Sequence, residues 1–204
     1  MFEGHMEIGV GLDYGLNLTF PDQDYLSQEA ARLGYSSIWT TETNGQDSFQ
    51  VCSQRWSASR MVIPEGLKTG ISVSPVLHRT PVGFAMSAGT MSLLTGGRFI
   101  LGLGSGLAYQ PRTRHNFGLP RLSALAMMRD YLITTRALLA GETVNYEGPT
   151  VTLRDVKLDI KPPPVTPVHL AALGPEMLRL AGELADGVAL NWHTPKQREW
   201  ARER

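Results

Sequence analysis

Residues 95–106 read Thr-Gly-Gly-Arg-Phe-Ile-Leu-Gly-Leu-Gly-Ser-Gly, and this stretch decides the fold class. The glycine pair at 96–97 ends a helical pattern, because glycine accepts the left-handed conformation at a helix C-terminus. Phe99 to Leu103 is apolar without polar alternation, which predicts a strand buried on both faces of a parallel sheet. A glycine-rich turn follows at 102–106, at the end of the strand where α/β proteins bind ligands.

The glycine turn allows three interpretations: a dinucleotide loop, a phosphate loop or a tight packing turn. A Rossmann loop needs Gly-x-Gly-x-x-Gly, but position 107 is leucine. The Lys-Ser/Thr pair of a phosphate loop is also missing. A packing turn and a ligand-binding turn both remain open. Ser105 lacks the Gly-x-Ser-x-Gly elbow, so the pattern disfavours a serine hydrolase.

The composition is that of an ordinary globular protein. The chain has 204 residues, of which 42% are hydrophobic and 19% charged, with a formal net charge of +0. This balance gives no basis for a nucleic-acid or anionic-membrane partner. Cys52 is the only cysteine, and no two histidines and an acid have metal-ligand spacing, so we expect no disulfide and no metal. No apolar run reaches membrane-spanning length and the start lacks a signal-peptide pattern, so we expect a cytoplasmic protein.

Strand-like and helix-like segments alternate six times along the chain. Each expected strand is followed by a helix, the strands covering 6–12, 35–41, 67–73, 99–103, 167–172 and 187–192. Such alternation predicts a parallel sheet covered by helices, either an open doubly wound sheet or a (β/α)₈ TIM barrel. Polar or glycine residues follow every strand without one dominant switch point, which favours the barrel. We therefore expect a single domain, 1–204, whose barrel is truncated after about six β/α units.

Within this domain, residues 107–166 form a distinct insertion region. We expect a long polar loop over 107–120 that shapes the substrate pocket, the longest helix over 121–140, and a hairpin over 141–158. In the first helix, at 21–33, the expected core face is formed by Tyr25, Leu26, Ala30 and Leu33.

Several motifs, taken in order, resemble the luciferase-like monooxygenase superfamily. They are Leu-Lys-Thr-Gly-Ile at 67–71, Arg-Thr-Pro at 79–81, and Ser-Leu-Leu followed by the glycine stretch at 92–106. Further matches are Gly34–Trp39 with Glu42, and the segments 138–148 and 167–192. The resemblance covers nearly the whole chain from Met6. It is nearest to the methylenetetrahydromethanopterin-reductase type, which uses coenzyme F420.

The resemblance implies a TIM barrel with a flavin or deazaflavin across the carboxyl ends of its strands. It implies Glu42 as the acidic, catalytic residue beside the ring, and a non-prolyl cis peptide at Ser72-Val73. It also implies a homodimer. The residues that it implies for cofactor binding are Ser72, Val73, Gly102, Gly104, Ser105, Gly106, Ala172, Gly174 and Asn191.

Each of these assignments has a purely structural alternative. Glu42 could instead be a capping or salt-bridged glutamate, and Thr43 stands where many relatives carry histidine. Ser72-Val73 could be an ordinary trans bond, and Gly174-Pro175 a routine helix start. Trp192 is a packing or stacking residue. The other rim candidates, each alternatively a solvated loop residue, are His78, Arg79, Arg112, Arg114 and His115.

The function implied is hydride transfer between coenzyme F420 and a small organic substrate. Two alternatives remain: an FMN-dependent monooxygenase that uses oxygen, and a shortened, non-catalytic flavin-binding or interaction protein. The chain stops at Arg204, inside the sixth helix. Three explanations are open: a fragment of a longer enzyme, a barrel closed by a partner chain, or a shortened family member.

Overall fold

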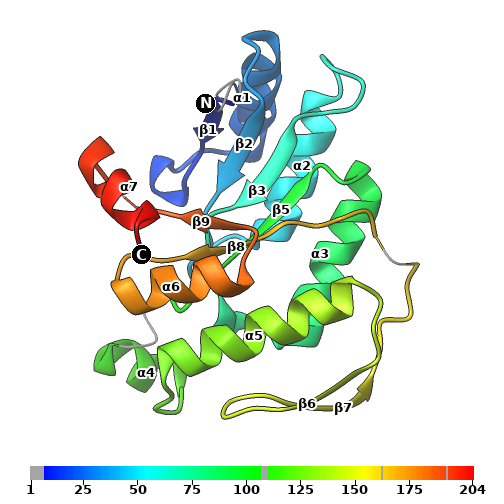
Figure 1. The fold of residues 1–204 in the computed structure, drawn as a ribbon. Helices are drawn as coiled ribbons and strands as arrows, with labels where there is room; N and C mark the ends of the chain where they lie inside the picture. The colour runs from blue at the N-terminus through cyan, green and yellow to red at the C-terminus, as the bar shows by residue number, and fades with distance from the viewer. Residues whose placement is uncertain (1–6, 107–109, 162, 192) are drawn as a thin grey trace.

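The structure, a computed structural model, describes residues 7–106, 110–161, 163–191 and 193–204. Its centre is a curled sheet of parallel strands (Figure 1). The strand order is β1 (Gly9–Gly11), β2 (Ser37–Thr40), β3 (Lys68–Ile71), β5 (Phe99–Gly104), β8 (Val168–Ala171) and β9 (Gly187–Ala189), with the short β4 (Ser74–Pro75) also paired to β5. The six expected parallel strands are thereby confirmed.

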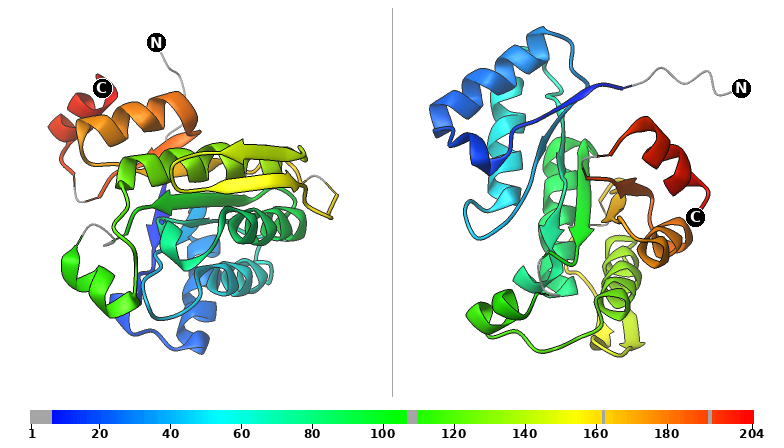
Figure 2. Two further views of the ribbon diagram at one scale, coloured as in Figure 1. Left: turned by 90° about the horizontal axis from the view of Figure 1, so that it is seen from below. Right: turned by 90° about the vertical axis from the view of Figure 1, so that its left-hand side faces the viewer.

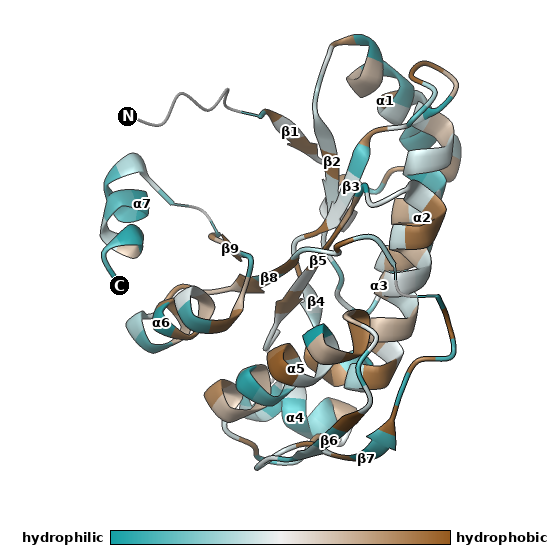
Figure 3. Ribbon diagram, turned by 45° about the vertical axis from the view of Figure 1, so that its right-hand side comes forward, coloured by the Kyte–Doolittle hydropathy of each residue, from teal (hydrophilic) through white to brown (hydrophobic). Residues whose placement is uncertain are grey.

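The helices lie along the outside of this curled sheet, as Figure 3 shows for α1, α2, α3, α5 and α6. Each of these packs on the next one along the chain. Their bounds are α1 Phe20–Arg32, α2 Ser48–Ser59, α3 Pro81–Thr95, α5 Ala124–Leu139, α6 Pro175–Leu184 and α7 Pro195–Arg202. Among the described residues, β1 pairs only with β2 and β9 only with β8, so the sheet is half of a barrel.

The helix starts follow the capping signals of the sequence. Asp47 caps α2, because its Oδ1 accepts from the backbone N–H groups of Phe49 and Gln50. Thr80 caps α3 in the same way through the N–H of Gly83, and Gly96, with φ of 63°, caps the other end just after Thr95. These local signals fix where α2 and α3 begin, and hence which loops reach the end of the sheet.

The expected loop at 107–120 was wrong in part, because it contains a helix. α4 covers Pro111–Phe117, with proline in its first turn and Gly118 at φ of 62° after its end. These are ordinary start and stop signals, and the polar composition of the segment concealed them. Residues 107–109 lie outside the described residues.

The core face expected for α1 was also wrong in part. Tyr25 is 61% exposed and Leu33 is 73% exposed. The helix instead buries Gln23, Ser27, Ala30 and Ala31. The physical reason is that Gln23 must face α2, because its side-chain oxygen accepts hydrogen bonds from the buried guanidinium of Arg55 on α2.

The main core lies between β5, β8 and the helices α3 and α5, and Figure 3 shows brown stretches on β5, β8 and α5. All six residues of β5 are buried, which confirms the strand expected at 99–103. The hairpin is also confirmed: β6 (Val144–Glu147) and β7 (Thr152–Val156) pair antiparallel and lie beside α5 (Figure 2). Buried Asp130 of α5 holds the hairpin by accepting from the Tyr146 hydroxyl at 2.7 Å and from the Thr150 N–H at 2.7 Å.

Candidate active site

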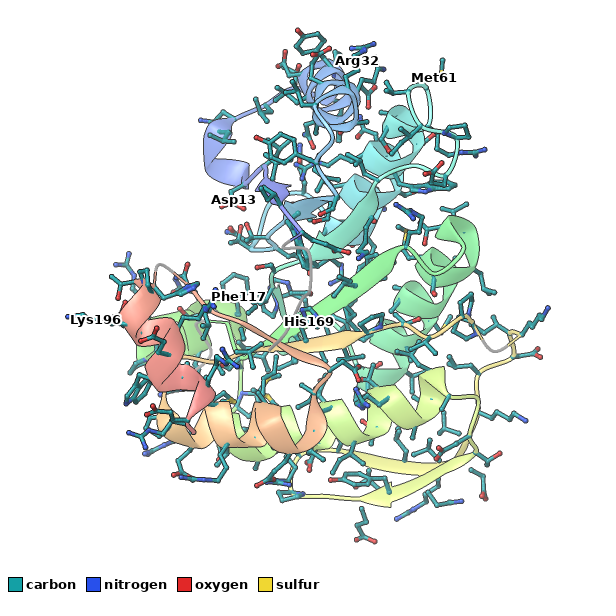
Figure 4. All side chains as sticks on the ribbon, turned by 45° about the horizontal axis from the view of Figure 1, so that its top comes forward. Asp13, Arg32, Met61, Phe117, His169 and Lys196 are labelled. Carbon is teal, nitrogen blue, oxygen red and sulfur yellow. The ribbon has the colours of Figure 1, made fainter. Side chains whose placement is uncertain are left out.

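A cavity of about 370 Å³ opens at the carboxyl ends of β2, β4 and β5. Apolar walls from Pro75, Leu77, Phe117 and Leu119 face a few polar groups. We call it the rim cavity; its other lining residues are Glu42, Thr43, Asn44, His78, Ser105, Gly106 and Thr113. Figure 4 labels Asp13 and Phe117, which lie in segments that follow the carboxyl ends of β1 and β5. A mostly apolar cavity with a few convergent polar groups is typical of a small-molecule site.

The Ser72–Val73 peptide bond is cis, as the family resemblance implied. Two backbone hydrogen bonds attach this segment to the neighbouring strand end. The N–H of Ser72 donates to the carbonyl of Thr40 at 2.7 Å, and the N–H of Glu42 donates to the carbonyl of Val73 at 3.0 Å. The cis segment and Glu42 therefore hold one another at the rim.

Two glycines of the glycine-rich turn at 102–106 allow two segments of the chain to pack closely. A Cβ on Gly102 would collide with the carbonyl oxygen of Ile71, and one on Gly104 would lie 2.6 Å from Cγ2 of Val73. Both glycines are buried. Ser105 and Gly106, one step further along, line the rim cavity. Contact of Gly102 and Gly104 with a cofactor therefore stays a prediction, while their packing role is a finding.

Glu42 is a buried carboxylate with a nearly complete set of donors. Its Oε2 accepts from Arg79 Nη1 at 2.6 Å and from the hydroxyl of Ser74, and its Oε1 accepts from Arg79 Nη2 at 2.7 Å and from the Ser48 N–H at 3.3 Å. Burial would raise the pKa of Glu42, but the hydrogen bonds from Arg79 and Ser74 and the charge of Arg79 outweigh it and lower the pKa. The carboxylate is thus held ionised.

Arg79 is committed to protein partners and is not a free cation of the rim. Besides Glu42, it pairs with Asp47, the capping residue of α2. Its guanidinium carbon also lies 4.9 Å from the ring centre of Phe49 and 5.6 Å from that of Phe84. Its alternative interpretation, a solvated loop residue, is therefore wrong, and its role at the rim stays a prediction.

The remaining predicted site residues lie on the other half of the rim. Ala172 is buried after β8, Gly174 is exposed at the N-terminus of α6 with open space at its Cα, and Asn191 is exposed after β9. None of these three lines the rim cavity. The structure thus brings Glu42, Ser105 and Gly106 together in one cavity, with Ser72 and Val73 beside them. Trp192 lies outside the described residues.

Sequence reasoning missed the partners of Glu42 and the contribution of α4. Arg79 and Ser74 are 37 and 32 positions away from Glu42, and no spacing rule connects them. Thr113 and Phe117 reach the rim cavity because their segment is helical, although its role in shaping the pocket was expected. In the described part of the chain, no three His, Cys, Asp or Glu residues are grouped as metal ligands.

The curled parallel sheet and the cavity at its carboxyl edge together define an α/β protein of the TIM-barrel class. Within that class, the chain belongs to the luciferase-like monooxygenase family, whose sequence model matches residues 7–204. No helix of the described residues is long and apolar enough to cross a membrane.

The chain is also similar in sequence to curated proteins. The chain is 29% identical over 194 residues to a 5,10-methylenetetrahydromethanopterin reductase of Archaeoglobus fulgidus, covering 95% of this chain and 56% of that protein. It is 29% identical over 164 residues to an F420-dependent glucose-6-phosphate dehydrogenase of Amycolatopsis mediterranei, covering 78% of this chain and 49% of that protein.

The fold matches that of the coenzyme F420-dependent tetrahydromethanopterin reductase from Methanopyrus kandleri. The TM-score is 0.80 at 24% identity, over 97% of this chain and 59% of that one. A monooxygenase from Streptomyces bottropensis has a TM-score of 0.75 at 16% identity, over 97% of this chain and 64% of that one. The chain therefore spans about half to two-thirds of the length of these relatives.

Proposed function

We propose that this chain binds coenzyme F420 at the rim cavity and belongs to an oxidoreductase that transfers hydride between F420 and a small organic substrate. The observation that carries the proposal is the sequence match, since F420-dependent enzymes are among the relatives that align over most of the chain. The apolar rim cavity beside the cis Ser72–Val73 segment supports it. When bound, a deazaflavin supplies the hydride chemistry, and the protein supplies binding and orientation.

The residues present suit an aromatic ring with polar edges. Pro75, Leu77 and Phe117 offer apolar surface to such a ring, and Ser105 offers a hydroxyl at its edge. On the other half of the rim, Gly174 leaves open space at the first N–H groups of α6, where a helix N-terminus favours an anionic tail. In this proposal Ala172 and Asn191 border the same cofactor.

Glu42, which the resemblance implies as the catalytic residue beside the ring, enters the proposal as a hydrogen-bond acceptor and a positioning residue. Its carboxylate is held ionised by Arg79, so it does not supply a proton at neutral pH. Through its own N–H it fixes the carbonyl of Val73, and through Oε2 it fixes the hydroxyl of Ser74. Its task is to hold the segment 72–74 in place at the cavity.

The test is a titration of the purified chain with F420 and, separately, with FMN, followed by fluorescence and thermal melting. The proposal expects saturable F420 binding and a raised melting temperature, because a ligand that binds only the folded state stabilises it. A preference for FMN would contradict the F420 assignment and favour the monooxygenase alternative. A cooperative melt without binding of either cofactor would overturn the proposal and favour a non-catalytic protein.

The homodimer remains part of the proposal. Analytical ultracentrifugation of the cofactor-loaded chain measures it directly. We expect a mass of twice the chain, and a monomer at all loading concentrations would contradict it.

A further inference from the structure

A second cavity, of about 390 Å³, lies above the carboxyl ends of β1 and β2. We call it the polar cavity, because among its lining residues Leu18 supplies the one apolar side chain. Its polar groups come from three sources: hydroxyls such as those of Thr41 and Thr43, side-chain amides such as Gln46, and two opposite charges. Some of these groups bond to one another, since Gln46 Oε1 accepts from Gln23 Nε2 at 3.3 Å and Asp13 Oδ1 accepts from the Thr41 hydroxyl at 3.3 Å. An apolar ligand would remove water from the remaining polar surface and offer it no hydrogen bond.

The positive charge belongs to Arg55 of α2, which is only 4% exposed. Its Nη2 donates to the Leu12 carbonyl at 2.8 Å and its Nη1 to the Trp39 carbonyl at 3.0 Å. Nε and Nη2 also donate to Oε1 of Gln23 at 3.1 and 3.0 Å. Four of the five guanidinium N–H groups thus donate to described residues, and the fifth, on Nη1, has no acceptor among them. Arg55 lines the cavity.

The negative charge belongs to Asp13, in the loop after β1. In the described part of the chain, its carboxylate has one side-chain partner, the Thr41 hydroxyl at 3.3 Å. No carboxylate of the described residues forms an ion pair with Arg55. Asp13 and Arg55 therefore face the same space as an acceptor and a donor that do not neutralise each other directly.

These groups select an uncharged ligand with several hydroxyls. A phosphate would be repelled by the carboxylate of Asp13, and most of the Arg55 N–H groups that could offset this repulsion already donate to protein acceptors. A metal ion is disfavoured because no three ligating side chains are grouped in the described residues. A hydroxyl both donates and accepts, so neighbouring hydroxyls satisfy Asp13, the threonines and the amides together.

We propose that the polar cavity is a binding site for a small polyol with vicinal hydroxyl groups. Thr43 lines this cavity and also the rim cavity, so the two cavities are neighbours. A polyol in the polar cavity would thus lie next to the cavity proposed for the cofactor. Its role as the substrate rests on the proposed function, whereas its binding does not.

The test is a titration of the isotopically labelled chain with xylitol, followed by the backbone amide signals of Asn17, Thr41 and Gln46. We expect saturable shifts at these amides. 1,5-Pentanediol is the matched probe, since it has five carbons but no vicinal hydroxyls, and it should leave the signals unchanged. Equal shifts with pentanediol, or no shifts with xylitol, would overturn the proposal. Stronger shifts with inorganic phosphate would overturn it in favour of an anion site.

Two variants locate the site. Asp13→Asn keeps the shape and removes the charge, and we expect it to weaken xylitol binding about tenfold. Asp159→Asn is the same change at an exposed position outside both cavities, and it should bind as the unchanged chain does. Equal affinity in both variants contradicts the assignment to the polar cavity. The xylitol titration is done without cofactor, so it is independent of the F420 titration. If the chain binds xylitol but not F420, the polyol site is supported and only the proposed function is contradicted.

Discussion

Both carboxylate oxygens of Glu42 accept hydrogen bonds from the guanidinium of Arg79, at 2.6 Å on Oε2 and 2.7 Å on Oε1. The pair joins the end of β2 to the loop before α3, and Arg79 also reaches the capping residue of α2. The Glu42–Arg79 ion pair thus connects the N-terminal ends of α2 and α3 with the segment 72–74 beside the rim cavity.

Loss of Arg79 should destabilise the fold strongly. Arg79→Met leaves a buried carboxylate without its counter-charge, and we expect a loss of about 3 kcal/mol in the free energy of unfolding. Arg129→Met is the matched control, because Arg129 and its partner Glu183 are 45% and 46% exposed, and it should cost less than about 1 kcal/mol. Urea unfolding at neutral pH measures both values. Equal losses would contradict a special role for the Glu42–Arg79 pair.

The Glu42 contribution to stability should depend on pH. Because the pKa of Glu42 is lower in the folded chain than its ordinary value of 4.5, its stabilising contribution is present above that value and is lost as pH falls through the folded pKa. The stability difference between the unchanged chain and Glu42→Gln should therefore be largest near neutral pH and shrink in acid. Thermal melts of both proteins across pH check this. A difference that grows in acid would show that Glu42 is not held ionised.

Much of the fold was predictable because its signals are local. Pro81 after Thr80, Asp47 before α2 and the apolar run of β5 each fix an element from neighbouring residues. Glu42 and Ser105, which the family resemblance implied as site residues, each follow a strand end and line the same cavity. The Arg79–Glu42 and Arg55–Gln23 contacts were not predictable, since they join residues far apart in the chain and depend on how the helices are rotated.

The close approach at Gly102 should make this position intolerant of a side chain. A Cβ there would collide with the backbone oxygen of Ile71, which cannot rotate away, so Gly102→Ala should cost about 2 kcal/mol. Gly182→Ala is the control, because Gly182 lies in α6 with nothing within 4 Å of an added Cβ. It should raise stability by up to about 1 kcal/mol. Denaturant unfolding distinguishes the two, and a stabilising Gly102→Ala would contradict the packing role of this glycine.

Tyr146 should resist ionisation. Burial raises its pKa, as do its hydrogen bond to Asp130 and the charge of that carboxylate, to about 12. In an ultraviolet titration of tyrosinate, Tyr146→Phe should therefore remove a late-titrating component and leave the earlier ones. Removal of an ordinary component near pH 10 would mean that the hairpin does not dock on Asp130 in solution.

The central claim is that the rim cavity holds the deazaflavin, and the F420 affinity of a variant that fills this cavity tests it most directly. Ser105→Phe places a ring in the space beside Gly106, whereas Ser57→Phe makes the same change at an exposed position on α2. The account predicts that Ser105→Phe binds F420 at least about tenfold more weakly than the unchanged chain, while Ser57→Phe binds as tightly. Undiminished F420 affinity in a folded Ser105→Phe variant would contradict it.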